Sequence, residues 1–264
     1  MLGAVIGDIV GSIYEGGNRP PKDFPFFGAG ARFTDDTVLT IAVADALLDD
    51  KPPARTLAEW ARRYPGRGYG AGFAAWVRKG ELEPYGSFGN GAAMRVSPAA
   101  WLARSLEEAL VMARRVTEVT HNHPEGLKGA AATVHAIVLV REGASPEAIR
   151  EAIAAGYGYD MARTMDGIRP RYVFNATCQG TVPEALICAL EATSFEDAIR
   201  NAVSLGGDTD TLAAIAGPVA EARFGIPEEI AERGRSYFTE EMRGIMERLY
   251  ARAGSLPGQV PAGR

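Results

Sequence analysis

The sequence LGAVIGDIVGSIY at residues 2–14 has apolar side chains at helical spacing and glycines at positions Gly3, Gly7 and Gly11. Residues four apart lie on one face of a helix, so these glycines form a flat stripe on which another helix can pack closely. The stretch lacks the period of two that marks a half-buried strand. It therefore predicts a first helix in close contact with a second one.

Helical spacing of apolar residues recurs along most of the chain, and β-branched clusters bounded by turns are rare. Because alanine is also abundant, pattern and propensity agree on an all-α fold of roughly ten helices. The predicted helices span residues 2–14, 38–48, 57–64, 106–119, 129–140, 146–155, 182–192, 195–205, 212–224 and 228–250. Two long irregular stretches, 16–33 and 156–181, interrupt them, and loops of this length are usually functional or mobile.

The composition is that of an ordinary soluble globular protein: 264 residues, 47% hydrophobic and 23% charged. One core suffices for this length, so we predict a single domain over residues 1–253 and a flexible, Gly/Pro-rich tail over residues 254–264. The net charge of -5 and the absence of a long basic run argue against a partner bound along a nucleic-acid backbone.

The cysteine content and the N-terminal segment both favour a cytoplasmic protein. Cys178 and Cys188 are too few for a disulfide framework and form no C-x-x-C pair, which predicts buried free thiols in a reducing compartment. The apolar segment 1–13 has no basic n-region, carries Asp8 at its centre and is too short to span a bilayer. We expect no signal peptide and no membrane segment.

Two acidic clusters precede apolar helical runs: Thr34-Asp35-Asp36-Thr37, and Asp208-Thr209-Asp210-Thr211 after Gly206-Gly207. Either cluster alone is explained as a helix cap, because Asp and Thr oxygens accept hydrogen bonds from the free N–H groups of a helix start. Together, however, they supply four carboxylates, and neither contains a Lys or Arg. The pair is therefore also a candidate metal site.

If the fold brings the four aspartates together, their repulsion requires a positive counter-charge. Two divalent cations would balance four carboxylates, and hard oxygen donors without a thiolate suit Mg²⁺ or Mn²⁺, suit Ca²⁺ less well and argue against zinc. The hypothesis requires that Asp36 and Asp210 lie close together.

The Asp208-x-Asp210 pattern has two other interpretations. An EF-hand loop needs a liganding side chain at its fifth position and a glutamate at its twelfth, where this chain has Leu212 and Val219. A haloacid-dehalogenase-type phosphatase also uses such a motif, but its aspartate should follow an apolar strand, whereas a helix-like run and two glycines precede Asp208. The EF-hand interpretation is excluded, and the phosphatase interpretation remains as an alternative.

The stretch YGSFGNGAAMR at residues 85–95 is rich in glycine and precedes a helix predicted to begin near Ala92. Its backbone amides suit an anion such as a diphosphate, although a simple turn with Phe88 as a core anchor is an equally available interpretation. His121 and His123 have no third soft ligand nearby, which favours a hydrogen-bonding or ligand-contacting role, and His135 is predicted to pack.

The ordered set of motifs resembles the ADP-ribosylglycohydrolase family. The motifs are Gly7-Asp8-x-x-Gly11-x-x-x-Glu15, Thr34-Asp35-Asp36-Thr37, Gly89-Asn90-Gly91-x-x-Met94-Arg95, Thr120-His121 and Gly206-Gly207-Asp208-Thr209-Asp210-Thr211. Each is unspecific alone, but together they span nearly the whole chain.

This resemblance implies a compact orthogonal all-α bundle with two divalent cations, Mg²⁺ or Mn²⁺, at the bottom of an ADP-ribose cleft. The metal ligands it implies are Thr34, Asp35, Asp36, Asp208, Asp210 and Thr211. The residues it implies at the diphosphate and adenine are Ser87, Phe88, Gly89, Asn90 and Gly91, with His121 as a further ligand contact. Glu15 matches a glutamate that gates the cleft in some members.

The implied activity is release of ADP-ribose from a mono-ADP-ribosylated protein or other acceptor, with the arginine N-glycosidic linkage ranked first. Nucleic acid would enter only as a modified substrate. Two cations at the ribose hydroxyls would position the sugar and activate a water, and the catalytic candidates are Glu15, Asp36 and Asp210. Residues 156–181 match no transferable motif and are expected to shape the leaving-group side. The alternatives are an aspartate-dependent phosphatase and a non-catalytic ADP-ribose binding module.

Overall fold

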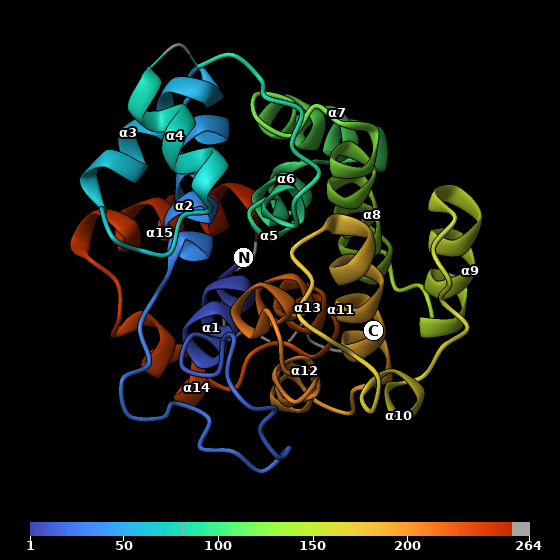
Figure 1. Ribbon diagram of the computed structural model, residues 1–264. Helices are drawn as coiled ribbons and strands as arrows, with labels where there is room; N and C mark the ends of the chain where they lie inside the picture. The colour runs from blue at the N-terminus through green and yellow to red at the C-terminus, as the bar shows by residue number, and fades with distance from the viewer. Residues whose placement is uncertain (81, 255–264) are drawn as a thin grey trace.

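The computed structural model describes residues 1–80 and 82–254, and its architecture confirms the predicted all-α orthogonal bundle (Figure 1). Within the described residues there is no strand, and the sole bridge pairs Gly89 with Thr177. The helices are α1 (Leu2–Gly11), α2 (Asp35–Leu48), α3 (Pro53–Arg63), α4 (Ala71–Lys79), α5 (Gly91–Met94), α6 (Ser97–Leu102), α7 (Leu106–Thr117), α8 (Pro124–Arg141), α9 (Pro146–Tyr157), α10 (Met165–Ile168), α11 (Cys178–Glu191), α12 (Phe195–Val203), α13 (Thr209–Phe224), α14 (Glu228–Arg235) and α15 (Glu240–Ala253).

Helices α1 and α13 form the closest pair at the centre of the bundle (Figure 1). A Cβ atom added to Gly3 would lie 2.3 Å from the carbonyl oxygen of Gly217, and one added to Gly7 would lie 2.1 Å from that of Ala213. At Gly11 it would lie 2.5 Å from the carbonyl oxygen of Thr209. The predicted glycine stripe is thus the contact surface that brings the two backbones together.

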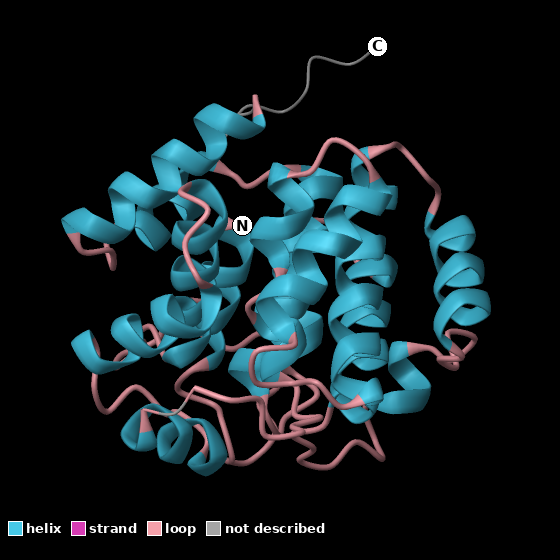
Figure 2. Cartoon of the chain, turned by 90° about the horizontal axis from the view of Figure 1, so that it is seen from above, coloured by secondary structure: helices cyan, strands magenta, loops and turns pink. Residues whose placement is uncertain are grey.

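The central pair is surrounded by the remaining helices. Helix α13 also packs against α11, α12 and α8, while α2 packs against α3 and α15. Many of the connecting loops gather along one edge of the bundle, at the bottom of the view in Figure 2. The first turns of α2 and α13, which carry the acidic clusters, line one cavity together with the loop before α5.

Several predicted helix boundaries are wrong. The expected helix 228–250 is two helices, because Thr239 caps a new start by accepting a hydrogen bond from the Met242 N–H at 3.3 Å. Helix α1 ends at Gly11, so Glu15 lies in the turn beyond it. Helices α4 and α6 were not expected, whereas the helix predicted to begin near Ala92 is the short α5. The stretch 156–181, predicted to be irregular, includes α10 and the first turn of α11.

Two arginines anchor the long loops to the connection between α12 and α13. The Arg19 guanidinium donates to the carbonyl oxygens of Leu205 at 2.9 Å and Tyr172 at 2.7 Å. The Arg169 guanidinium donates to those of Ser204 at 3.0 Å and Pro20 at 3.3 Å. The loop after α1 and the segment before α11 are therefore held against the Gly206-Gly207 connection.

Three further predictions concern the thiols, the membrane and the tail. Cys178 and Cys188 are free and buried, as expected. None of the described helices combines the length and the apolar character needed to cross a membrane. The predicted tail, residues 254–264, lies outside the described residues except for Gly254, which follows α15.

Candidate active site

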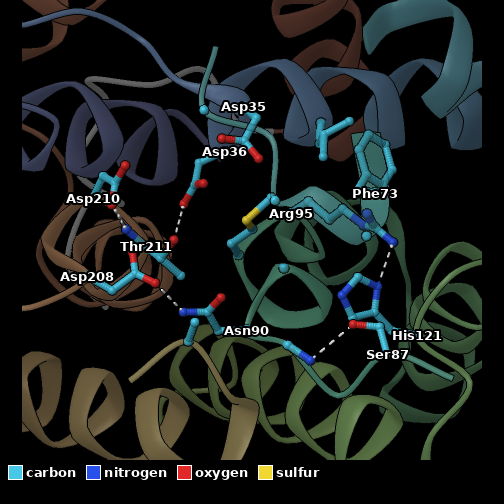
Figure 3. Close-up of a pocket in the computed structure, with 18 of the residues that line it drawn as sticks. Asp35, Asp36, Phe73, Ser87, Asn90, Arg95, His121, Asp208, Asp210 and Thr211 are labelled. Atoms are coloured by element: carbon cyan, nitrogen blue, oxygen red, sulfur yellow. Dashed lines mark hydrogen bonds between the residues drawn. The ribbon is translucent and has the colours of Figure 1, made fainter. Parts of the chain in front are cut away.

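The two acidic helix starts meet, as the sequence analysis required. The Thr211 hydroxyl at the start of α13 donates to a carboxylate oxygen of Asp36 at the start of α2, at 2.9 Å (Figure 3). The backbone N–H of Thr211 donates to Asp210 at 2.9 Å. Thr211 therefore links Asp36 and Asp210, and all three side chains are buried.

A third acidic side chain reaches the cluster from the turn after α1. Glu15, Asp208 and Asp210 each offer a carboxylate oxygen, and these three oxygens lie within 4.8 Å of one another. Asp208 also accepts a hydrogen bond from the Asn90 side-chain amide at 2.7 Å. This bond attaches the acidic cluster to the glycine-rich loop before α5.

Burial and mutual repulsion act on these carboxylates. Burial, and then the charge of Asp210, raises the pKa of Asp36 well above its usual range. Burial, and then the charge of Asp208, does the same to the pKa of Asp210. Burial, and then the negative charge of Asp8, raises the pKa of Asp35 to about 7.

No basic side chain in the described part of the chain forms an ion pair with any of these acids. Buried carboxylates without a positive partner are costly, and a set of hard oxygens is the donor set that divalent cations such as Mg²⁺ and Mn²⁺ prefer. The residues present therefore fit a metal site.

Asp8 organises the first of the two acidic clusters. Its carboxylate accepts hydrogen bonds from the backbone N–H of Thr34 at 2.9 Å and of Thr37 at 3.0 Å, and from both threonine hydroxyls. The Thr34 hydroxyl also accepts a hydrogen bond from the Asp36 N–H at 3.2 Å, so one lone pair of its oxygen remains unused. Sequence reasoning gave Asp8 no role, although a lone aspartate amid apolar residues was a visible signal.

The glycine-rich loop is fixed by the segment before α11. The Asn90 N–H donates to the carbonyl oxygen of Ala176 at 2.8 Å, and the Cys178 N–H donates to that of Phe88 at 3.0 Å. The Phe88 side chain is 44% exposed and lies beside the His123 ring, with centroids 5.1 Å apart. The interpretation of Phe88 as a core anchor is therefore wrong.

One cavity of about 350 Å³ joins the acidic cluster to the glycine-rich loop, within the size range of small-molecule sites. The predicted site residues that line it are Glu15, Asp35, Asp36, Ser87, Gly89, Asn90, Gly91, His121, Asp208, Asp210 and Thr211. Thr34 and Phe88 do not line it; Thr34 sits behind the cluster on Asp8. Phe174 and Ala176 of the stretch 156–181 supply part of its wall.

A model of the ADP-ribosylglycohydrolase family matches residues 1–257. The chain belongs to this family. Its curated relatives include the ADP-ribosylhydrolase ARH3 of Danio rerio, 27% identical over 302 residues, which cover 86% of this chain and 82% of that protein. They also include the ADP-ribosylarginine hydrolase Tri1 of Pseudomonas putida (strain GB-1). It is 28% identical over 294 residues, which cover 96% of this chain and 77% of that protein.

A solved structure described as an ADP-ribosylglycohydrolase-related protein complex superimposes with a TM-score of 0.75 at 27% identity, covering 96% of this chain and 95% of that one. The ADP-ribosylglycohydrolase fold is therefore shared along almost the whole length. Asp208 follows α12 and a short loop, not the strand that a haloacid-dehalogenase-type phosphatase requires.

Arg95 and Thr120 belong to the family motifs and were given no role from the sequence, but both contact His121 in the wall of the cavity. Arg95 is almost wholly buried, and its guanidinium donates to the Thr120 hydroxyl at 2.6 Å. Thr120 in turn contacts the His121 ring. His135, by contrast, packs against Tyr157 outside the cavity, as predicted for this histidine.

Proposed function

We propose that this ADP-ribosylglycohydrolase is a hydrolase that cleaves mono-ADP-ribosylated substrates and releases ADP-ribose. The observation that carries the proposal is the single cavity in which four aspartates and Glu15 face a glycine-rich loop. An acidic pole suits cations that hold a sugar diol, and a glycine-rich loop without bulky side chains lets a diphosphate approach closely. ADP-ribose carries both groups.

At the acidic pole, we assign two divalent cations, Mg²⁺ or Mn²⁺, to Thr34, Asp35, Asp36, Asp208, Asp210 and Thr211. When bound, such cations supply electrophilic stabilisation and lower the pKa of a water. The chain's own contribution is orientation: Asp8 holds Thr34, Asn90 holds Asp208, and Thr211 holds Asp36. One oxygen of Asp208 and one of Asp36 are thereby held in a fixed position.

At the other pole, we assign the diphosphate and the adenosine to Ser87, Gly89, Asn90 and Gly91, with Phe88 as an exposed stacking surface and His121 as a hydrogen-bonding contact. The loop geometry supports this assignment, because the bonds from Asn90 to Ala176 and from Cys178 to Phe88 tie the loop to the segment before α11 before any ligand arrives. A preformed loop loses less conformational entropy on binding.

Proton transfer during cleavage is assigned to Glu15, Asp36 and Asp210. Glu15 reaches the cluster from a turn, while Asp36 and Asp210 are held by the first helical turns. We therefore propose that Asp36 and Asp210 keep fixed positions and that Glu15 meets the acceptor side of the glycosidic bond, where a general acid or base is needed.

For the acceptor, we rank an arginine N-glycosidic linkage first, which the relative named ADP-ribosylarginine hydrolase supports. The wall formed by Phe174 and Ala176 would contact the leaving group. We place the protein in the cytoplasm, a proposal supported by its buried free cysteines, which are typical of a reducing compartment.

The test is to incubate the full-length protein with arginine-, serine- and nucleobase-linked ADP-ribose in Mg²⁺ or Mn²⁺ and to follow each product by mass spectrometry. We expect free ADP-ribose from the arginine conjugate, and loss of release after chelation or in Asp210→Asn. Asp23→Asn is the matched control, because this exposed aspartate is outside the cavity.

Three results would contradict the proposal. Release that persists after exhaustive chelation would exclude the metal centre. Inorganic phosphate as the product would indicate the phosphatase. Saturable ADP-ribose binding without turnover of any conjugate would indicate a binding module.

A further inference from the structure

Arg95 is a buried cation that can donate hydrogen bonds but cannot accept them. It lies just after α5 and is 1% exposed, and in the described residues it forms no ion pair with a carboxylate. One of its terminal nitrogens, Nη2, lies 2.6 Å from the Thr120 hydroxyl. The same nitrogen lies 3.4 Å from Nδ1 of His121 (Figure 3). A guanidinium can only donate hydrogen bonds, so both of these atoms must present a lone pair to it.

This constraint sets the direction of the next hydrogen bond. The Thr120 oxygen accepts from Arg95 and lies 2.8 Å from Nδ1 of His121. Because Nδ1 presents a lone pair, the Thr120 hydroxyl donates to it. A neutral imidazole with an unprotonated Nδ1 carries its proton on Nε2.

The other edge of the His121 ring faces the floor of the cavity. A Cβ atom added to Gly91 would lie 3.4 Å from Nε2, and one added to Gly89 would lie 3.6 Å from it. Across residues 1–80 and 82–254, Nε2 has no hydrogen-bond partner within the protein. Its proton is therefore directed at the space beside the glycine-rich loop.

We propose that Arg95 and Thr120 are positioning residues that hold His121 as a neutral ring with its proton on Nε2, aimed at an oxygen of the bound substrate. That this oxygen belongs to the diphosphate rests on the function proposed above, whereas the proton position does not. Burial, and then the charge of Arg95, lowers the pKa of His121 well below its usual range, in agreement with a neutral ring. Besides Arg95, the Tyr85 ring faces His121, with centroids 6.2 Å apart.

The proton position can be measured on the ligand-free, full-length protein. Long-range ¹H–¹⁵N correlation spectra at pH 7 distinguish the two neutral tautomers and the imidazolium of each histidine. The chain has three histidines, and His123→Gln and His135→Gln assign the spectrum by loss of one pattern each. We expect His121 to show a protonated Nε2 and an unprotonated Nδ1. A proton on Nδ1, or on both nitrogens, overturns the proposal.

Substitutions test the two positioning residues. Thr120→Ser keeps the hydroxyl and should preserve the wild-type pattern, while Thr120→Val removes it and should give a second population with the proton on Nδ1. Arg95→Met removes the first donor and should have the same effect. If it does not fold, the wild-type spectrum and the Thr120 pair decide the proposal. An unchanged single tautomer in Thr120→Val overturns the role of Thr120.

Calorimetry with ADP-ribose separates this inference from the proposed function. We expect Thr120→Val to bind ADP-ribose about tenfold more weakly than Thr120→Ser, the size expected for one hydrogen bond to a charged group. If the wild-type protein shows the expected tautomer but does not bind ADP-ribose, the proposed function fails while the positioning of His121 stands. Equal binding by both Thr120 variants overturns the role of the His121 proton in binding.

Discussion

The hydroxyl of Thr211 donates a hydrogen bond of 2.9 Å to the carboxylate of Asp36, and this bond joins the first turns of α13 and α2. The two bonded residues are 175 positions apart in the sequence. The bond fixes one carboxylate oxygen of Asp36 and thereby also sets the position of the second oxygen.

The first prediction follows from this bond. We expect Thr211→Val to weaken Mn²⁺ binding about tenfold to a hundredfold relative to Thr211→Ser, the effect expected for a hydrogen bond to a buried charged group. Isothermal titration calorimetry with Mn²⁺ alone measures the difference. Equal affinities for the valine and serine variants would show that the hydroxyl does not matter.

The second prediction concerns Asp8, whose carboxylate accepts four hydrogen bonds from Thr34 and Thr37. Asp8→Asn replaces one of the two acceptor oxygens by an N–H₂ group and removes the negative charge from the remaining hydrogen bonds, so we expect a loss of about 2 kcal/mol in the free energy of unfolding. Urea unfolding measures the loss, with Asp23→Asn as the control. A loss below 1 kcal/mol in Asp8→Asn would contradict the prediction.

The third prediction tests the contact between α1 and α13. Gly7→Ala would place its Cβ 2.1 Å from the Ala213 carbonyl oxygen, and the backbones must separate. We expect it to lower the free energy of unfolding by about 2 kcal/mol or more. Gly244 in α15 has no atom within 4 Å of an added Cβ, so Gly244→Ala should be neutral or stabilising by up to about 1 kcal/mol. Similar values for the two variants would argue against the close contact.

The fourth prediction concerns pH. Burial raises the pKa of the Cys178 thiol from 9.0 to about 12. As the pH rises above 9.0, the unfolded chain loses this proton before the folded chain does, so the thiol's contribution to the free energy of unfolding falls between pH 9 and 12. Stability curves from pH 8 to 10.5 should be flatter for Cys178→Ala than for the wild type. Parallel curves would contradict the shift.

The same burial makes both cysteines unreactive in the folded protein. At pH 8 we expect a thiol reagent to label neither Cys178 nor Cys188 in the native chain and to label both after denaturation, because only an accessible thiolate reacts. Mass spectrometry of the intact protein counts the labels.

Local signals in the sequence predicted part of this architecture. The spacing of Gly3, Gly7 and Gly11 indicated a close helix contact because such a stripe has few other uses. The metal hypothesis required Asp36 and Asp210 to lie close together, and the bonds of Thr211 to both residues confirm that they do. The break between α14 and α15 was missed because the apolar spacing continues across it and the capping residue Thr239 was not recognised.

Other features depend on how the chain folds and could not be predicted from the residue types. The partners of Asp8 lie in a different helix start, so its role depends on the fold. The direction of the Arg95, Thr120 and His121 bonds depends on distances that the residue types do not set. Arg19 binds backbone carbonyl groups, which every residue possesses.

That last feature has an evolutionary consequence. Because Arg19 contacts the main chain of Tyr172, this attachment does not depend on the side chain at that position. Natural selection is thus free to vary side chains beside Phe174 while the acidic cluster of the same cavity is kept. One scaffold can give rise to enzymes that differ in the molecules they accept.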